Sequence, residues 1–545
     1  MGIRFALVVG VVGLVYGGLL YKLYGVQVVD GPYYVAKAQS FAMASGALEA
    51  RRGTIFFTGI EGEKIPVALD KELPEIYAVP NLIVDAESMA EKIAPVLGLD
   101  KKEVLTKLLK QNDTYELLVA RTEPALAHVV ENAKLTGIFV KERPQRFYPF
   151  EAMAANVLGY VGPDNKGTRT SGHYGAEEFY NTELAGMPGT IEEGKMMPPI
   201  DGSDLVFTLN PDVQSEAERI IDGLITTHKA TGGGVIVMDP KTGAIRAMVS
   251  RPSFDPNAYA KTDIASFKNY MTQETYEPGS VIKLLTMASG LDAGVITPET
   301  TYMDRGKITM NGKTIRNFDY DTKGARGKLP MTAIIENSLN TGAVFVGQAL
   351  GREKFTEYFR AFGVGEKTGV DALGEGKGDL RRLNPKEKDI AFATAAYGQG
   401  MTVTPLGLIS AVASIANGGM LMRPYMNAAL GAQEVRKVVS AKSATQVTAM
   451  MVSAVDKAGV AHINGYSIAG KTGTAHIPDF KKGGYTEEVV NTYIGFAPAH
   501  NPKFIVLVKL DKPLGAPAAA VTVVPAFREL AQFVLNYFAI PPDRL

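Results

Sequence analysis

One apolar segment near the amino terminus restricts how this chain can fold more than any other feature. Phe5–Tyr21 contains no charged residue over 17 positions and is bracketed by Arg4 and Lys22. As a helix rising about 1.5 Å per residue, such a run reaches the lower limit of a bilayer span. We therefore expect residues 5–25 to anchor the chain in a membrane, with one large domain set on one side of it.

A cleaved secretory signal and a buried core helix are the alternatives to an anchor. A secretory signal has an apolar core of about 7–15 residues, closely followed by a small-residue cleavage site. The nearest such pattern, Ala36-Lys37-Ala38, lies far beyond the run. Four glycines within the run would be costly in a soluble helix. No later apolar run is long enough to span a bilayer, so we expect a single anchor.

Composition excludes several classes of function. The 545-residue chain has 57 Lys plus Arg and 57 Asp plus Glu, so its formal net charge is zero. Nucleic-acid binding through phosphate neutralisation needs a basic excess, and we expect no nucleic-acid partner. The chain has no cysteine, which excludes thiolate chemistry, and its six histidines form no HExxH motif or close pair. We therefore expect no metal site.

In the rest of the chain, the pattern of residues changes near Leu205. Residues 26–204 mix charged helical patterns with Gly/Pro punctuation, and residues 205–545 place β-rich runs on both sides of a mostly helical middle, about residues 278–460. Strands early and late around helices predict one sheet assembled from both ends of a domain. Helices are predicted at 87–94, 101–111, 212–228 and 526–538, strands at 234–238, 244–249, 467–476, 490–497 and 503–510, and a hairpin turn at 239–243.

The first motif that carries chemistry is Ser280-x-x-Lys283. Glu277-Pro278-Gly279 breaks the chain just before a predicted helix, so Ser280 lies at or near its amino terminus, with Lys283 one turn later. A helix-capping serine and a solvated lysine would give the same pattern. Apolar neighbours on both sides of Lys283 indicate burial, however. Burial lowers the pKa of a lysine and lets it act as the base that a serine nucleophile needs.

Two further motifs follow in order. Ser338-x-Asn340 lies at a predicted helix start and supplies a hydroxyl and an amide. Lys-Thr-Gly occurs three times, at residues 241–243, 367–369 and 471–473. Only the third triplet lies in a β-rich run after the other motifs, where its glycine lets a substrate backbone approach closely. The order S-x-x-K, S-x-N, K-T-G is similar to the motif set of penicillin-binding proteins and class A β-lactamases.

The sequence resembles the class B, monofunctional penicillin-binding proteins over nearly its whole length. These are membrane-anchored peptidoglycan D,D-transpeptidases. Phrases outside the three motifs also carry the resemblance. They are Arg52–Ile55, Arg146–Pro149, Val157–Gly162, Gly175–Glu177, Val237–Pro240 with Thr242-Gly243, Pro252–Asn257, Gly398–Gly400, Ala416–Gly419 and Gly495–Pro498.

The resemblance implies an α+β fold and a domain order. A cytoplasmic tail at residues 1–4 and a transmembrane helix at 5–25 would precede a mixed α/β pedestal, or dimerisation-type, domain at 26–204. Residues 205–545 would form a transpeptidase domain like that of serine β-lactamases, with an antiparallel sheet, helices on both faces and a helical subdomain. The bulk of the chain would lie outside the cytoplasmic membrane, in the periplasm or extracellular space.

The resemblance also implies roles for the residues of the first two motifs. Ser280 would attack the carbonyl between the terminal D-alanines of a stem peptide, and Lys283 would take its proton. Ser338 would relay a proton to the leaving D-alanine, and Asn340 would hold the substrate amide and Lys283. An amine from a neighbouring strand would then attack the acyl-enzyme to form the cross-link, and β-lactams should acylate Ser280.

The third motif would bind the substrate. Lys471, Thr472, Gly473 and Thr474 would hold its terminal carboxylate, by charge-assisted hydrogen bonds from the lysine and the two hydroxyls. The backbone N–H groups of Ser280 and Thr474 would form the oxyanion hole. No metal or organic cofactor is needed. The family suggests a separate SEDS-type membrane glycosyltransferase as a partner, together with other divisome or elongasome proteins.

The chain departs from the family pattern in four places, and several functions stay open. Phe57-Thr58 replaces a usual Asp-Arg, and Asn156, Leu339 and Gly407 replace a usual histidine, serine and glutamine. The first two departures bear on the bracing of the pedestal. A D,D-carboxypeptidase, a β-lactamase and a catalytically silent scaffold or β-lactam sensor are the alternative functions. The segment 491–496 slightly favours a division role over an elongation role.

Overall fold

The computed structural model describes residues 2–30, 50–110, 115–164, 170–192, 195–479 and 481–544. An apolar helix, α1 (Gly2–Tyr24), continues into a π-helical turn, η1 (Gly25–Val29). Within the described ranges, Leu7–Val29 is the one helical segment long and apolar enough to cross a membrane by length and composition. The pattern Ala36-Lys37-Ala38 lies outside the described residues.

The chain divides into two compact units whose segments alternate along the sequence. The first comprises residues 1–54, 69–147 and 182–204, and the second comprises residues 55–68, 148–181 and 205–545. The division at residue 204 that the sequence suggests stays a prediction.

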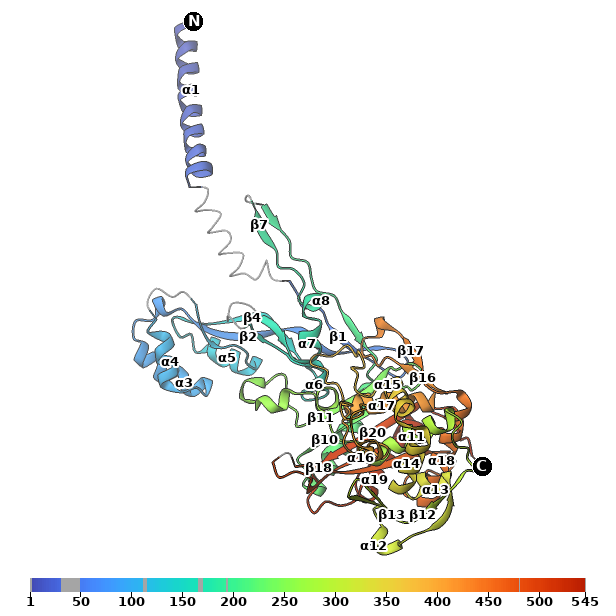
Figure 1. The fold of residues 1–545 in the computed structure, drawn as a ribbon. Coiled ribbons are helices and arrows are strands. Elements are labelled where there is room, and N and C mark those ends of the chain that lie inside the picture. The colour runs from blue at the N-terminus through green and yellow to red at the C-terminus, as the bar shows by residue number, and fades with distance from the viewer. Residues whose placement is uncertain are drawn as a thin grey trace. The chain divides into compact units, whose positions relative to one another are not determined.

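In the first unit, helices pack on a small antiparallel sheet (Figure 1). Residues 69–78 of β2 (Lys64–Ala78) pair with β4 (Ile138–Phe147) and β3 (Glu116–Val119). Asp85 caps the amino terminus of α3 (Ala86–Leu97) by accepting a hydrogen bond from the Ser88 N–H. The other elements are η2 (Pro80–Leu82), α4 (Lys101–Leu108), α5 (Pro124–Asn132), α8 (Asn181–Ala185), β7 (Thr190–Glu192) and β8 (Lys195–Met197). Helices are thus confirmed near 87–94 and 101–111, although Gln111 lies outside the described residues.

A five-stranded antiparallel sheet forms the centre of the second unit, in the order β11-β10-β20-β19-β18. The strands are β10 (Gly232–Met238), β11 (Ile245–Arg251), β18 (Ala469–Pro478), β19 (Tyr485–Ala497) and β20 (Phe504–Asp511). Early and late segments therefore build one sheet, and β10 and β11 pair on either side of the predicted hairpin turn. Both predictions are confirmed. β18 is an edge strand of this sheet.

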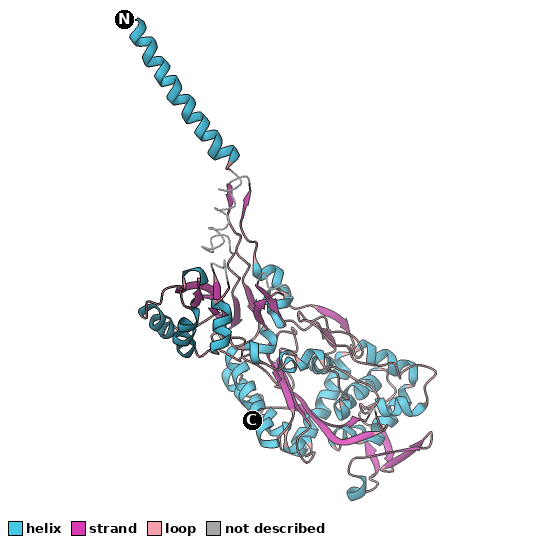
Figure 2. Ribbon diagram, turned by 90° about the vertical axis from the view of Figure 1, so that its left-hand side faces the viewer, coloured by secondary structure: helices cyan, strands magenta, loops and turns pink. Residues whose placement is uncertain are grey.

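Helices cover both faces of the central sheet, as Figure 2 shows. Val235 and Val237 point to the face covered by α9 (Pro211–His228) and α19 (Val523–Tyr537), where they share one apolar core. Asn210 caps α9 by accepting from the N–H groups of its first turn. The helices on or beyond the other face are α10 (Tyr270–Gln273), α11 (Lys283–Asp292), α13 (Met331–Glu336), α14 (Asn340–Leu350), α15 (Arg352–Ala361), α16 (Asp389–Ala395), α17 (Pro405–Ala416) and α18 (Ala441–Ala458).

The middle of this unit is less helical than the sequence predicted. Residues 301–330 form two small two-stranded sheets, one of them a hairpin, and a short helix, which Figure 1 places together at the edge of the unit. Asn311 and Gly312 both adopt positive φ and join two of the strands, and Asn-Gly is a strong hairpin signal. The elements are β12 (Thr301–Asp304), β13 (Lys307–Met310), β14 (Lys313–Arg316), α12 (Tyr320–Lys323) and β15 (Gly327–Pro330), and β16 (Met420–Met422) pairs with β17 (Glu434–Lys437) farther along.

Shorter elements complete the second unit and contain two of the unusual positions. Phe57 is fully buried, and Thr58 donates to the Phe207 carbonyl oxygen at 2.7 Å. The buried Asn156 amide donates to the carbonyl oxygens of Ser266 (2.7 Å) and Lys268 (3.0 Å). The elements are β1 (Ile55–Thr58), α6 (Ala155–Leu158), β5 (Tyr160–Pro163), β6 (Thr170–His173), α7 (Gly175–Phe179), β9 (Leu205–Phe207), η3 (Tyr259–Lys261), η4 (Ile264–Phe267), η6 (Ala428–Leu430) and η7 (Ala519–Val521).

Candidate active site

Ser280 and Lys283 meet as the sequence predicted. Ser280 lies in a 3-10 turn, η5 (Gly279–Ile282), that leads into α11. Gly279 takes a φ of +57°, which a glycine adopts at little cost. One turn later, the Lys283 Nζ lies 2.9 Å from the Ser280 Oγ. Ser280 is only half-buried, so its hydroxyl is accessible beside the amine.

Lys283 is an amine held inside the protein. Its side chain is 1% exposed, and its Nζ donates to the Ser338 carbonyl oxygen at 2.6 Å and contacts the Ser338 Oγ at 3.1 Å. Burial, and next the charge of Lys471, lower the pKa of Lys283 well below that of a free lysine. The direction agrees with the expectation from its apolar neighbours, and it favours a neutral amine that can accept a proton.

Ser338 lies between two lysines. It precedes α14 in a turn with a φ of +52°, and its Oγ is 3.1 Å from the Nζ of both Lys283 and Lys471. A left-handed conformation at a non-glycine residue costs of order 1–3 kcal/mol and is held in place by surrounding structure. The next residue, Leu339, at the position where the family often has serine, is fully buried.

Asn340 faces a different partner from the one expected. Its side-chain amide donates to the Arg316 carbonyl oxygen at 2.8 Å. Among the described residues it forms no hydrogen bond with Lys283, because the Ser338 carbonyl oxygen accepts from that amine instead. The half-buried Asn340 side chain keeps its amide oxygen available to a ligand.

Lys471 comes to the same hydroxyl from the edge strand β18. Its side chain is 4% exposed, and its Nζ contacts the Thr472 Oγ1 at 3.2 Å as well as Ser338. Burial lowers the pKa of Lys471 to about 7. A bound carboxylate would favour the charged amine and raise that pKa again.

Two glycines let β18 lie against the nucleophile. A Cβ on Gly473 would lie 2.8 Å from the Pro278 carbonyl oxygen, and one on Gly279 would lie 3.2 Å from the Thr474 carbonyl oxygen. Gly473 therefore lets the enzyme's own backbone at Pro278 approach the strand, whereas the sequence predicted that this glycine makes room for the substrate backbone. The half-buried Thr474 contacts the Ala519 N–H through its hydroxyl at 3.3 Å.

The structure separates the three Lys-Thr-Gly triplets. Residues 241–243 occupy the β10–β11 turn, and residues 367–369 lie in a loop where Thr368 donates to Glu375. Of the three, only residues 471–473 form a described hydrogen bond with one of the serine motifs, from the Lys471 Nζ to the Ser338 hydroxyl. Within the described ranges, no group of three or more His, Cys, Asp or Glu side chains could hold a metal ion.

A buried polar network behind Asn340 was not predicted. Asp304 accepts from the Thr341 hydroxyl (2.8 Å) and the Asn317 amide (3.0 Å), and the Asn317 side-chain oxygen accepts from the Thr341 N–H (3.1 Å). All three side chains are buried. The network joins the 301–330 lobe to the first turn of α14. The only sequence signal for it was the overlooked Asn-Gly turn that sets this lobe.

Family comparisons identify two domains in the chain. Residues 233–532 match the penicillin binding protein transpeptidase domain, and residues 47–194 match the penicillin-binding protein dimerisation domain. The chain belongs to the class B penicillin-binding proteins, which join these two domains. It therefore carries a transpeptidase domain of α+β fold behind an apolar N-terminal helix, and both the family and the fold class predicted from sequence are confirmed.

The relatives include a sporulation protein and a peptidoglycan D,D-transpeptidase. The chain is 31% identical to the stage V sporulation protein D of Bacillus subtilis over 525 residues, which cover 90% of this chain and 78% of that protein. It is 26% identical to the peptidoglycan D,D-transpeptidase FtsI of Escherichia coli K12, covering 99% of this chain and 93% of that protein. The crystal structure of penicillin binding protein 2X from Streptococcus thermophilus has the same fold, with a TM-score of 0.71, 22% identity and coverage of 91% of this chain and 81% of that one.

Proposed function

We propose that Ser280 is the nucleophile of a serine D,D-transpeptidase that cross-links peptidoglycan through the D-Ala-D-Ala ends of stem peptides. One observation carries the proposal: the half-buried Ser280 hydroxyl lies 2.9 Å from a buried amine whose pKa is lowered. Lys283 takes the hydroxyl proton as Ser280 attacks the carbonyl between the two D-alanines. The tetrahedral oxyanion lies between the backbone N–H groups of Ser280 and Thr474, which are preorganised donors.

Release of the first product needs a proton on the departing amine. Ser338 lies 3.1 Å from Lys283 and can pass that proton from the lysine to the leaving D-alanine. The Asn340 amide oxygen binds the substrate backbone. An amine from a neighbouring strand then attacks the acyl-enzyme with the roles of base and acid reversed, which frees Ser280 and forms the cross-link.

The edge strand holds the substrate carboxylate. Lys471 is charged in part of the population at neutral pH, since its pKa is about 7, and a carboxylate stabilises the charged form. The hydroxyls of Thr472 and Thr474, on alternate residues of one strand, point to the same side and complete the carboxylate site, with Gly473 between them. A β-lactam carries a carboxylate and a reactive acyl group and acylates Ser280 in the same way.

The remaining assignments follow from the family and from composition. Residues 1–4 lie in the cytoplasm and 5–25 in the cytoplasmic membrane, while the pedestal at 26–204 and the transpeptidase domain at 205–545 lie outside it. Because this chain is monofunctional, its partner is a separate SEDS-type glycosyltransferase within a divisome or an elongasome. Localisation of a fluorescent fusion tests the role: midcell supports division, and the sidewall supports elongation.

A fluorescent penicillin combined with a cross-linking assay tests the enzyme. Wild-type protein should take up one label per chain, on Ser280 by mass spectrometry, and should form cross-links from stem peptides and an acceptor amine. Ser280→Ala should fold, bind no penicillin covalently and form no cross-link. A penicilloyl adduct on another residue would refute the assignment. Release of D-alanine without cross-links would indicate a carboxypeptidase, and labelling without turnover a sensor or scaffold.

A further inference from the structure

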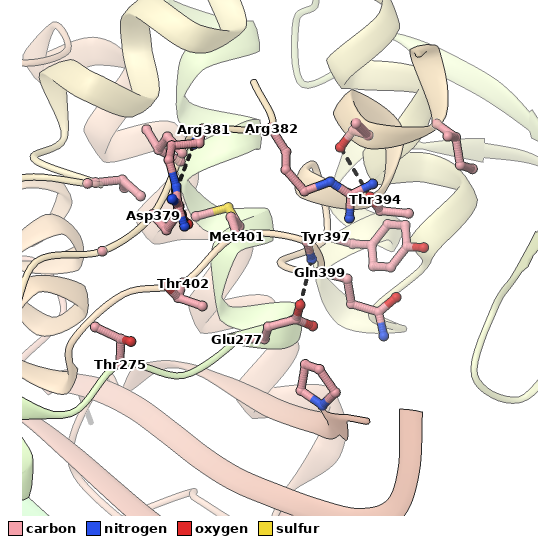
Figure 3. Close-up of a pocket in the computed structure, with 18 of the residues that line it drawn as sticks. Thr275, Glu277, Asp379, Arg381, Arg382, Thr394, Tyr397, Gln399, Met401 and Thr402 are labelled. Carbon is pink, nitrogen blue, oxygen red and sulfur yellow. Dashed lines mark hydrogen bonds and ion pairs between the residues drawn. The ribbon is translucent and has the colours of Figure 1, made fainter. Parts of the chain in front are cut away.

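A cavity of about 1210 Å³ in the second unit lies beside the nucleophile segment and holds none of the motif residues (Figure 3). Its wall includes Glu277, three residues before Ser280, and Pro478, the last residue of β18. Figure 3 shows Arg381 and Arg382 on one side of this cavity and Glu277 on the other. The cavity therefore adjoins the site at the far end of the substrate-binding strand.

Positive charge dominates the cavity wall. Lys313, Arg360, Lys377 and Arg382 line it, and none of them forms an ion pair with a described residue. The wall also contains Arg381, paired with Asp379 at 2.7 Å, and Glu366, paired with Arg436. Unpaired cations that share one concave wall raise the local concentration of anions.

The one carboxylate close to the nucleophile segment offsets little of this charge. Glu277 is buried, and it accepts hydrogen bonds from the Gly400 N–H at 2.9 Å and the Tyr485 hydroxyl at 3.0 Å. Burial raises its pKa above the ordinary value of a glutamate. Its acceptor atoms are thus already used within the wall, and the exposed cations remain available to a ligand.

The direction of a bound peptide leads into this cavity. β18 is an edge strand, so an extended peptide can add to it through backbone hydrogen bonds. In the proposed mechanism the terminal carboxylate lies at Lys471 and Thr472 and the reacting carbonyl at Thr474, so the preceding residues continue towards Pro478. The four residue steps of strand from Thr474 to Pro478 span about 14 Å at about 3.4 Å per residue.

We propose that this cavity binds carboxylate groups on the donor peptide, on the part that precedes its two terminal D-alanines. The inference rests on the function proposed above, because that function fixes the direction of the peptide. It adds a substrate class to the site: an anionic donor peptide. A side-chain carboxylate three residues before the D-alanine pair lies about 10 Å along the strand and reaches the cations with its own length.

Two synthetic peptides ending in D-Ala-D-Ala provide the test, identical except for glutamate or glutamine at that third preceding residue. Wild-type enzyme should be acylated about five- to tenfold faster by the glutamate peptide, since each exposed ion pair contributes modestly. Acylation is measured without an acceptor amine and normalised to penicillin acylation of the same protein. In the Ser280→Ala background, fluorescence anisotropy should show the same preference in binding, without chemistry.

Matched variants locate the effect. Lys313→Ala combined with Lys377→Ala should bring the glutamate-to-glutamine ratio close to one. Lys354→Ala combined with Lys437→Ala removes two exposed lysines outside the cavity and should keep the wild-type ratio.

Equal binding of the two peptides by wild type would overturn the proposal, as would an unchanged ratio in the cavity variant. A preference that appears only when an acceptor amine consumes the acyl-enzyme would assign the cavity to the acceptor and also overturn it. Failure of the proposed function is seen separately, as penicillin that does not label Ser280.

Discussion

Two Lys-Thr-Gly triplets of identical sequence have different structures. In the strand triplet, residues 471–473, the lysine is 4% exposed, shares a serine hydroxyl with a second buried lysine and has a pKa of about 7. In the loop triplet, residues 367–369, the lysine is exposed, and Thr368 and Gly369 bind the carboxylate of Glu375. The first triplet keeps its hydrogen-bonding groups for a ligand, and the second uses them within its own loop.

The difference arises from the surrounding fold. Residues 471–473 lie on an edge strand, so one row of backbone groups is not paired within the sheet and faces the nucleophile segment. In residues 367–369 a buried carboxylate accepts two N–H groups and a hydroxyl, which makes the triplet a structural turn. Three letters therefore define a site only when topology supplies an edge, a buried amine and a neighbouring hydroxyl.

The largest expected effect tests whether the buried amine beside the strand triplet is the base. Lys283→Arg should lower penicillin acylation by about 10²–10⁴-fold, because a guanidinium stays protonated and cannot accept the serine proton. In wild type the active form is the neutral amine, so the acylation rate should rise with pH. The lowered pKa of Lys283 moves the midpoint of that rise well below the value of a free lysine.

Stopped-flow acylation by a chromogenic β-lactam measures this profile. A range of about pH 5 to 10 covers the lowered pKa of Lys283 that burial is expected to produce. Circular dichroism of both proteins controls for folding. An arginine variant with near-normal rates would mean that Lys283 contributes only a fixed charge and that the base lies elsewhere.

The second prediction compares the triplets directly. Thr472→Val should lower acylation by about 10- to 100-fold, because it removes a hydroxyl aimed at the substrate carboxylate and hydrogen bonds to charged groups contribute about 1.5–3 kcal/mol. Thr368→Val and Thr242→Val should leave the acylation rate near that of wild type. The measurement is the second-order rate constant of acylation of each variant by the same penicillin. Equal losses at all three positions would remove the distinction between the triplets.

A smaller effect is expected from the network behind Asn340. Thr341→Val removes a donor to the buried Asp304 carboxylate, which lies 2.8 Å away, and should lower the free energy of unfolding by about 1.5–3 kcal/mol. Acylation should fall by about tenfold, since a misplaced Ser338–Asn340 turn aligns the substrate poorly. Thr341→Ser keeps the hydroxyl and should restore the rate. A serine variant as slow as the valine variant would show that the methyl packing matters instead.

Much of the central sheet could be predicted from sequence, because its strands are short β-rich runs between clear turns. The helix predicted at 212–228 is α9, and the last helix differs from the expected 526–538 by a few residues. The 301–330 lobe was missed because its four-residue strands bury few side chains and resemble the polar loops around them. The sequence signal for this lobe is the Asn311-Gly312 turn, which is typical of a hairpin.

The residues of the candidate site could be picked from motif order, but their contacts could not. Burial of Lys283 followed from its apolar neighbours, whereas its bond to the Ser338 carbonyl oxygen depends on the left-handed turn at Ser338. The same turn orients Asn340 so that its side-chain amide donates to the Arg316 carbonyl oxygen. A local pattern cannot show which backbone oxygen a side chain from 55 residues away will find.

At the loop triplet we expect no effect on activity but a loss of stability, which tests whether this triplet is purely structural. Thr368→Val keeps the shape of the side chain but removes the hydroxyl that donates to Glu375, a buried carboxylate still held by the N–H groups of Thr368 (2.6 Å) and Gly369 (3.1 Å). Losing one donor should cost about 1.5–3 kcal/mol of stability. The Thr242 hydroxyl lies in a turn and, among the residues that the structure describes, accepts one hydrogen bond, from the Ala244 N–H at 3.2 Å. Thr242→Val should therefore cost no more than about 0.5 kcal/mol. Thermal unfolding of the penicillin-free proteins measures both, with acylation recorded in parallel. If Thr368→Val slowed acylation in proportion to its lost stability, the loop would contribute to the site, and its likeness to residues 471–473 would be functional.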